Sequence, residues 1–181
     1  MSAPVIIEDY DPNWPIRFET LRAPIAAALG PLAAAIEHIG STAVAGLAAK
    51  PIIDIDVLLK SSVDLAAAVT ALSSLGYQHE GDLGIAGREA FRAPPESIAH
   101  HLYVCLPDST EFQRHLAFRD YLRVHPDAAE AYASLKRRLA AKFATDRVAY
   151  TQAKTRFIEE ILRHLESVSR EQSIQHPRTI I

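Results

Sequence analysis

The sequence lacks the features that mark exported, membrane-spanning or disulfide-stabilised proteins. Cys105 is its single cysteine, which excludes an internal disulfide and fits a reducing compartment. No apolar run is long enough to cross a bilayer, and the first residues hold no apolar stretch suited to export. We therefore expect a soluble protein with a cytoplasmic localisation and no membrane partner.

The chain also lacks a strong charge of either sign. Its formal net charge is -3 at pH 7, so no bulk electrostatic attraction to nucleic acid or to anionic membranes is expected, and there is no strong nucleic-acid signal. The 49% of hydrophobic residues is enough for a sizeable core. The length of 181 residues suits one domain, or one domain with a helical extension.

The main chemical signal is a pair of acids inside an apolar strand. Residues 51–59 are predicted to form a buried strand that nevertheless carries Asp54 and Asp56. Side chains two apart on a strand share a face, so both acids point the same way. Two such carboxylates repel unless a cation lies between them, and Mg²⁺ is often held by one or two carboxylates together with substrate phosphates. The pair could also be a solvated edge face or two caps, and that alternative stays open.

A small hydroxyl-rich turn precedes this strand. Gly40 lets the backbone approach a ligand closely, and exposed amides at a turn such as that of Ser41 and Thr42 attract phosphate. Lys50 lies just before the strand, where it is either a surface lysine next to proline or a cation that meets a phosphate near Ser41. The turn and the two acids together indicate a phosphate site beside a metal site.

These two motifs carry a resemblance to known proteins. A Gly-Ser pair followed by an Asp-x-Asp strand resembles the nucleotidyltransferase superfamily typified by DNA polymerase beta. The longer run over residues 40–55, Gly-Ser-Thr-Ala-Val-Ala-Gly-Leu-Ala-Ala-Lys-Pro-Ile-Ile-Asp-Ile, resembles the GrpB family, a branch of that superfamily. The likeness covers about residues 5–165 and includes residues 10–14, 101–104, 118–122 and 150–154.

The resemblance implies an α/β fold with a nucleotidyltransferase-like mixed β-sheet flanked by helices and a C-terminal helical cap. We expect one domain over residues 1–167, with an α/β core at 1–109 and the helical cap at 110–167. A polar C-terminal tail is expected at 168–181. The site should then be a cleft between the turn at Gly40 and Ser41, the acidic strand and the cap.

Apolar periodicity and turn residues predict the elements of this fold. Strands are predicted at residues 5–8, 34–39, 51–59, 77–80, 89–93 and 100–106. Helices are predicted at 14–29, 63–75 and 110–125, with two more that begin at 126 and 151. The helix that begins at 126 carries a basic cluster of Lys136, Arg137, Arg138 and Lys142. We expect this cluster to be a solvated helix face, and a role in holding RNA or a nucleotide tail is the alternative.

The third acid of the superfamily has no obvious counterpart. A strand beside the acidic strand usually supplies it, but residues 100–106 contain no acid, and His101 is the residue that resembles the GrpB signature. We infer that His101 faces the two aspartates and replaces or supplements that acid, with Glu89 as the alternative. Imidazole suits divalent ions softer than Mg²⁺. Arg92 is preferred to Arg88 as a phosphate partner because its strand should neighbour His101, and a solvated arginine is the alternative.

The resemblance implies a transfer of a nucleoside monophosphate from an NTP to an unknown acceptor, which is a small molecule, a protein or RNA. Asp54 and Asp56 are the expected catalytic residues, and they hold Mg²⁺, Mn²⁺ or another divalent ion together with His101. The expected phosphate-binding residues are Gly40, Ser41, Thr42, Lys50 and Arg92. A catalytically degenerate module that binds nucleotide or metal is the second hypothesis, and a structural partner domain is the third.

Overall fold

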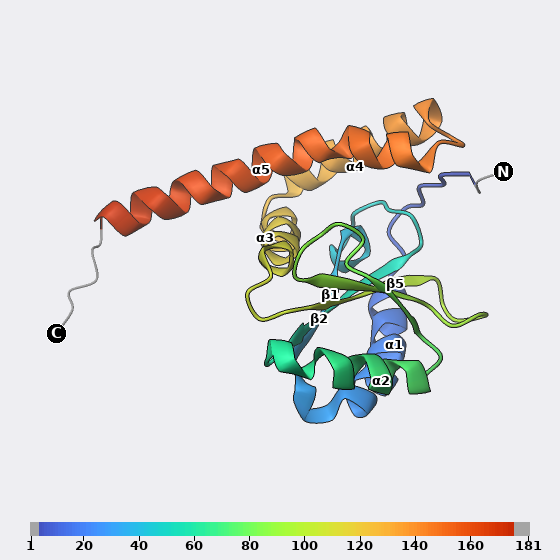
Figure 1. Ribbon diagram of the computed structural model, residues 1–181. Coiled ribbons are helices and arrows are strands. Elements are labelled where there is room, and N and C mark those ends of the chain that lie inside the picture. The colour runs from blue at the N-terminus through green and yellow to red at the C-terminus, as the bar shows by residue number, and fades with distance from the viewer. Residues whose placement is uncertain (1–3, 176–181) are drawn as a thin grey trace.

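The protein is organised around one mixed β-sheet with the strand order β1-β2-β5-β4-β3 (Figure 1). This computed structural model describes residues 4–175. Within that range the strands are β1 (Ala33–Ile39), β2 (Ile53–Leu59), β3 (Gln78–Gly81), β4 (Arg88–Arg92) and β5 (His100–Cys105). β2 pairs antiparallel with β1 and parallel with β5, and the other neighbours are antiparallel. The predicted α/β fold with a mixed sheet is confirmed.

Helices cover both faces of this sheet. They are α1 (Trp14–Leu29), α2 (Leu65–Ser74), α3 (Thr110–Val124), α4 (Pro126–Lys142) and α5 (Arg147–Gln175). α1 and α2 lie against one face, whereas α3, α4 and α5 lie over the other, and α5 extends well past the body of the molecule (Figure 1). Short 3-10 helices occur in the connections at Gly30–Leu32, Ser41–Ala43 and Ser62–Asp64.

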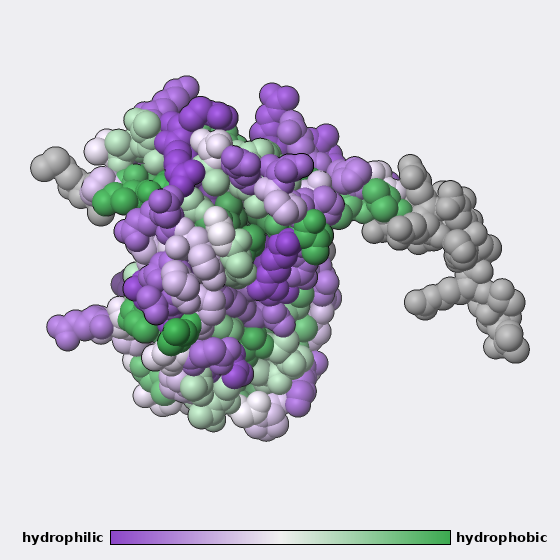
Figure 2. Space-filling model, turned by 180° about the vertical axis from the view of Figure 1, so that it is seen from behind, coloured by the Kyte–Doolittle hydropathy of each residue, from purple (hydrophilic) through white to green (hydrophobic). Residues whose placement is uncertain are grey.

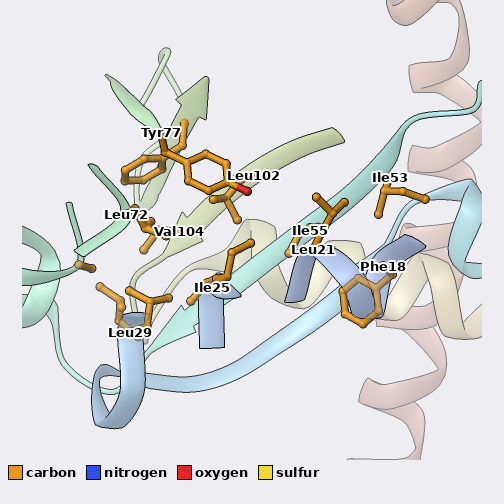
Figure 3. Packing of buried hydrophobic residues seen from close by; sticks show 14 of the residues in the cluster. Phe18, Leu21, Ile25, Leu29, Ile53, Ile55, Leu72, Tyr77, Leu102 and Val104 are labelled. Carbon is orange, nitrogen blue, oxygen red and sulfur yellow. The ribbon is translucent and has the colours of Figure 1, made fainter. Parts of the chain in front are cut away.

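The main hydrophobic core lies between the sheet and the helices α1 and α2. The buried stripe of α1 has the helical spacing predicted from the sequence, and its members are Trp14, Phe18, Leu21, Ile25 and Leu29. From the sheet, β2 and β5 contribute Ile53, Ile55, Leu102 and Val104 (Figure 3). Because side chains alternate along a strand, the two acids of β2 are left on the opposite face, toward α3, α4 and α5.

A second apolar cluster joins the segment after β1 to the helices on that opposite face. Its buried members are Val44, Leu47, Ala48, Leu122, Tyr132, Ala133 and Ile161. The turn that follows β1 therefore packs directly against residues of α3, α4 and α5. This packing decides which helical side chains reach the acidic strand.

The last helix begins earlier than the sequence predicts. α5 starts at Arg147 rather than at Thr151. The side chain of Asp146 accepts a hydrogen bond of 2.9 Å from the backbone N–H of Ala149, which satisfies one of the free donors at the helix start. The earlier start brings Arg147 into the helix, and this residue reaches the candidate site described below.

Two further differences concern the ends of the chain. The strand expected at residues 5–8 is a single bridge between Glu8 and Ala49. α5 continues to Gln175 through part of the segment expected as a polar tail, and the rest of that segment, 176–181, lies outside the described residues.

The surface is mixed in character. On the face seen in Figure 2, hydrophobic side chains lie in small groups among hydrophilic ones. No helix within residues 4–175 is both long enough and apolar enough to cross a membrane.

Candidate functional site

A cavity of about 420 Å³ lies on the face of the sheet that α3, α4 and α5 cover. It is bounded by β2, β5, the turn after β1 and side chains of those helices. The cations among its lining residues are Lys50, Arg88, Arg114, Lys136, Arg147 and Lys154. The acids that line it are Asp54 and Glu111. The excess of positive charge in a concave site favours an anionic ligand.

Asp54 and Asp56 lie side by side on the cavity face of β2. Asp54 lines the cavity with 29% of its side chain exposed, whereas Asp56 is fully buried. The Oδ1 atom of Asp56 has no hydrogen-bond partner among the described residues. Burial raises the pKa of Asp56, and the neighbouring His115 opposes that rise. A buried carboxylate oxygen without a partner is an open position for a cation or a proton donor.

Gly40 holds the turn after β1 against Asp54. Its φ is +70°, in the region that favours glycine, and a Cβ at this position would lie 2.3 Å from Oδ2 of Asp54. The next two residues, Ser41 and Thr42, begin the short 3-10 helix and line the cavity. Thr42 is buried, with its Oγ1 2.9 Å from Nε2 of His38. The absence of a side chain at Gly40 therefore allows the hydroxyl-rich turn to lie directly beside the acidic strand.

His101 of β5 is directly opposite Asp54 in the strand register. Its Nδ1 lies 2.7 Å from Oδ1 of Asp54, and its Nε2 lies 3.0 Å from a guanidinium nitrogen of Arg147. A guanidinium can only donate, so Nε2 accepts and Nδ1 carries the hydrogen that is donated to Asp54. The structure thus brings His101 to the acidic pair as a hydrogen-bond donor, and its role as a metal ligand stays a prediction.

His115 of α3 connects Asp56 to an acid of the same helix. Its Nδ1 lies 2.7 Å from Oδ2 of Asp56, and its Nε2 lies 3.3 Å from Oε1 of Glu111. Burial opposes the charged imidazole, but the hydrogen bonds to Asp56 and Glu111 outweigh it and raise the pKa of His115 to about 9. At neutral pH the proton lies on His115, so an imidazolium neutralises part of the carboxylate charge here.

The burial of the Lys136 side chain of α4 differs most from what the sequence predicts. The basic cluster of this helix is predicted to be solvated, yet Lys136 is only 2% exposed. Its Nζ donates a hydrogen bond of 2.8 Å to Oγ of Ser41 and another to the carbonyl oxygen of Ala48. Burial, with the nearby charges of Lys154 and Arg137, lowers the pKa of Lys136 to about 7. The prediction was wrong for Lys136 because α4 packs this side chain onto the turn after β1.

Two more lysines complete a group that we call the lysine cluster, formed by Lys50, Lys136 and Lys154. The Nζ atoms of Lys50 and Lys154 lie 5.3 and 4.7 Å from the centroid of the Tyr150 ring. Burial, and then the charge of Lys50, lower the pKa of Lys154 to about 8. Burial, and then the charge of Arg147, also lower the pKa of Lys50. Mutually repelling amines in a cavity are stabilised by a bound anion.

Besides the fully buried Asp56, two other predicted candidates, Arg92 and Glu89, are not among the cavity-lining residues. The Arg92 side chain is 67% exposed and forms an ion pair of 2.5 Å with Glu80. Glu89 pairs with His79 at 2.6 Å. In their place, Arg88 from the start of the same strand lines the cavity.

Sequence patterns did not single out Glu111, His115 or Arg147. All three come from helices, and no strand alternation or glycine turn marks them. The available signal was the spacing of Glu111 and His115, which places them four residues apart on one face of a helix. That spacing is common, so it could not by itself indicate a site.

The donor set fits a divalent ion that binds together with its substrate. Asp54 and Asp56 share one face of β2, and hard ions such as Mg²⁺ take one or two carboxylates and complete their shell with phosphate oxygens and water. The unpartnered Oδ1 of Asp56 suits such a role. Within residues 4–175, no group of three or more His, Cys, Asp or Glu side chains is arranged to hold a metal ion. Asp54 and Asp56 are thus the side chains that could hold such an ion.

Comparison with solved structures places this fold among known proteins. A crystal structure of the conserved protein GrpB from Enterococcus faecalis is 36% identical and covers 88% of this chain and 96% of that chain, with a TM-score of 0.80. A crystal structure of the Cid1 poly(U) polymerase with MgGTP bound is 18% identical, with a TM-score of 0.51 over 75% of this chain and 44% of that chain. At that identity the second likeness shows the fold alone, which is nucleotidyltransferase-like.

Comparison of sequences identifies the family. The family described as GrpB protein matches residues 4–164. The UPF0157 protein PA4798 of Pseudomonas aeruginosa is 41% identical over 91% of this chain and 69% of its own length. The UPF0157 protein YqkA of Bacillus subtilis is 36% identical over 83% of this chain, which spans only 44% of that protein. The chain therefore belongs to the GrpB family.

Proposed function

We propose that this protein is a nucleotidyltransferase that moves a nucleoside monophosphate from an NTP to an acceptor hydroxyl with the help of a divalent ion. The observation that carries the proposal is the contact of Lys136 with Ser41 beside Asp54, since it joins an oxyanion-binding pair to the acidic strand. The nucleotidyltransferase-like fold and the preference of the cavity for anionic ligands support the same reaction class.

The lysine cluster and Ser41 form the side of the cavity that binds the triphosphate. Protonated Lys136 donates to a phosphate oxygen, and the Ser41 hydroxyl, released from Lys136, donates to another. Lys50 and Lys154 add two more ammonium groups to the same region. This arrangement holds the leaving pyrophosphate and stabilises the negative charge that builds on it.

The acidic strand forms the reacting side. The acceptor oxygen forms a bond to the α-phosphorus while the bond from that phosphorus to the oxygen shared with the β-phosphate breaks, so pyrophosphate leaves. Asp54 and Asp56 would hold a divalent ion, which would neutralise negative charge on the phosphates. The acceptor hydroxyl releases its proton to water as its oxygen bonds to phosphorus, because Oδ1 of Asp56, the unpartnered carboxylate oxygen, is the atom that would hold the ion.

The first test of the proposal measures the binding of nucleotide and metal rather than the transfer reaction. Purified protein is titrated with a panel of NTPs, with and without Mg²⁺ or Mn²⁺, while its thermal stability is followed. A ligand at a hundredfold excess over its Kd stabilises the folded state by about 2.7 kcal/mol. We expect a shift in melting temperature that needs both metal and nucleotide and that is lost in the double variant Asp54→Asn/Asp56→Asn.

The control is Asp127→Asn, which changes an exposed acid of α4. Unchanged nucleotide binding in the folded double variant would refute the proposal.

A second candidate is a module that binds the metal–nucleotide pair without transferring the nucleotide. The observation that favours it is the absence of a third metal-binding side chain beside Asp54 and Asp56 within the described residues. Pyrophosphate release separates the two candidates. Release in the presence of at least one acceptor from a broad panel supports the transferase, and binding without release across the panel supports the module.

A further inference from the structure

Arg88 is a buried cation that has no part in the proposed handling of the triphosphate. It is the first residue of β4, only 9% of it is exposed, and its side chain lines the cavity. The guanidinium carbon lies 4.2 Å from the centroid of the Tyr103 ring, so the ring of β5 covers one face of the charge. This stacking positions the guanidinium without neutralising it.

The guanidinium of Arg88 has no anionic partner in the described part of the chain. Among residues 4–175, its Nε has no hydrogen-bond partner, and no carboxylate lies within 4.0 Å of it. The charge of Arg88 acts from a distance on the carboxylates of Asp56 and Glu111, and His115 contacts both of these acids directly. A buried charge without a directly bound anionic partner is costly, and a bound anion would satisfy it. By contrast, both cavity arginines that come from helices have partners within the protein, since Arg114 pairs with Glu159 and Arg147 donates to His101.

The strand order places Arg88 on the far side of the acids from the lysine cluster. Going across the sheet, the turn after β1 carries Ser41, β2 carries Asp54 and Asp56, β5 carries Tyr103, and β4 carries Arg88. The guanidinium of Arg88 is stacked on the Tyr103 ring of β5, which is the strand between β4 and β2. An anion bound at Arg88 is therefore separated from the triphosphate side by the reacting centre.

We propose that Arg88 binds an oxyanion group of the acceptor, so that the acceptor is a molecule with a phosphate or carboxylate on the side of its attacking hydroxyl that faces away from the donor triphosphate. A planar guanidinium with free N–H groups suits such a group because it can donate two parallel hydrogen bonds. This inference rests on the proposed function, since the donor nucleotide defines the other side of the cavity. It narrows the acceptor panel to anionic hydroxyl compounds, including chain ends that bear a terminal phosphate.

The test follows the NMR signal of the Arg88 side chain itself. Protein labelled with ¹⁵N at arginine is titrated with inorganic phosphate and, separately, with succinate, while the Nε–Hε signals are followed by NMR. The signal that disappears in Arg88→Lys is assigned to Arg88. We expect it to shift saturably with at least one of the two anions, and the response separates a phosphate site from a carboxylate site. Isothermal titration with that anion, which does not depend on the Arg88 signal, should show an affinity at least tenfold lower in Arg88→Gln and a smaller loss in Arg88→Lys, which keeps the charge.

A control variant on the same strand separates the effect of Arg88 from a general loss of positive charge. Arg92→Gln changes the arginine at the other end of β4, which is exposed and paired with Glu80. If Arg92→Gln rather than Arg88→Gln weakens anion binding, or if the Arg88 signal does not respond to either anion, the inference is overturned. A shift of the Arg88 signal by metal and NTP alone would also overturn it, because Arg88 would then belong to the donor side.

Nucleotide binding is measured on the same samples by the thermal shift with metal and NTP. Arg88→Gln is expected to bind the metal–nucleotide pair within about twofold of the wild type, since the lysine cluster is intact. Wild-type protein that binds nucleotide but shows no anion response at Arg88 refutes only this inference. An anion response without nucleotide binding refutes the proposed function and leaves an oxyanion site that serves another reaction.

Discussion

The Nζ of Lys136 donates a hydrogen bond of 2.8 Å to the Oγ of Ser41, although 95 residues separate the two in the sequence. The bond joins α4 to the turn after β1, next to the acidic strand. It places an amine with a pKa of about 7 where a phosphate would lie. Much of the expected behaviour of the site depends on this pair.

Replacing Lys136 by methionine should weaken nucleotide binding. The change removes the ammonium group but keeps an apolar stem of similar length, so the packing of α4 is retained. Loss of a charge-assisted hydrogen bond costs about 1.5–3 kcal/mol, which corresponds to a Kd roughly 10- to 100-fold higher. Isothermal titration calorimetry with an NTP and Mg²⁺ measures this change in Kd. Arg137→Met is the control, because Arg137 is the next residue and pairs on the surface with Asp9; equal effects of the two changes would contradict the assignment.

Nucleotide binding should take up a proton above pH 7. In the free protein the pKa of Lys136 is about 7, so most of this amine is neutral at pH 8. A bound phosphate favours the ammonium form and raises this pKa, so binding at pH 8 draws up to one proton from the buffer, whereas binding at pH 6 draws almost none from this group. Titrations in two buffers of different ionisation enthalpy measure the uptake. Uptake that persists in Lys136→Met would assign the proton to another group.

The same lysine should make the protein less stable as the pH falls toward neutrality. Its folded-state pKa of about 7 lies below the ordinary value of 10.5. Between these values the unfolded chain binds a proton that the folded chain does not, so the stabilising contribution is full above 10.5 and is lost as the pH falls toward 7. The slope from this group is at most about 1.4 kcal/mol per pH unit. Urea unfolding at pH 7, 8 and 9 should show a steeper rise in stability for wild type than for Lys136→Met, and parallel curves would contradict this.

Gly40→Ala should damage the site more than an equally strained change elsewhere. The added Cβ would lie 2.3 Å from Oδ2 of Asp54 and would take a φ of +70°. Gly46→Ala is a matched control, because its φ is +79° and nothing lies within 4 Å of its added Cβ. Backbone strain alone costs about 1–3 kcal/mol, and both variants should share it. Only Gly40→Ala is expected to lose metal-dependent nucleotide binding, and a similar loss in Gly46→Ala would show that strain, rather than the contact with Asp54, is responsible.

His115→Leu should make the fold depend on a divalent ion. The change removes the imidazolium that neutralises Asp56 and leaves a buried carboxylate without its cation. Breaking a buried pair in this way costs about 3–5 kcal/mol. We expect Mg²⁺ to restore part of this loss, so the rise in melting temperature on adding Mg²⁺ should be larger in the variant than in the wild type. The control His164→Gln, an exposed histidine of α5, should behave as the wild type, and a variant without any Mg²⁺ response would argue against an ion at Asp56.

The motifs of β2 are recognisable in the sequence because their signal is local. Alternation along one strand predicts that Asp54 and Asp56 share a face, and the register with β5 then places His101 across from Asp54. The apolar stripe of α1 follows from its own 3.6-residue period. The strand alternation and the helical period depend only on neighbours in the chain, so they can be predicted without tertiary information, whereas the pairing of His101 with Asp54 joins residues of two separate strands.

The helical side of the site has no such local signal. Lys136 belongs to a run of basic residues that is typical of a solvated helix face, and only the packing of α4 on the turn after β1 makes it a buried partner of Ser41. Arg88 and Arg92 were both candidates on one strand, and the positions of β3 and α3 decide that one lines the cavity while the other pairs with Glu80.

Local patterns were therefore sufficient for most of the strands and helices, the acidic pair and the glycine turn, because these depend on strand alternation, helical period and the conformational freedom of one residue, whereas the α/β fold itself was expected from the family resemblance. Long-range packing settles the remaining features of the site: which cations face the acids, which carboxylate His115 neutralises, and which arginine is left buried without an anion. Those outcomes depend on how helices distant in the chain pack over the sheet, and the free energy of that packing comes from contacts between residues that no local pattern relates.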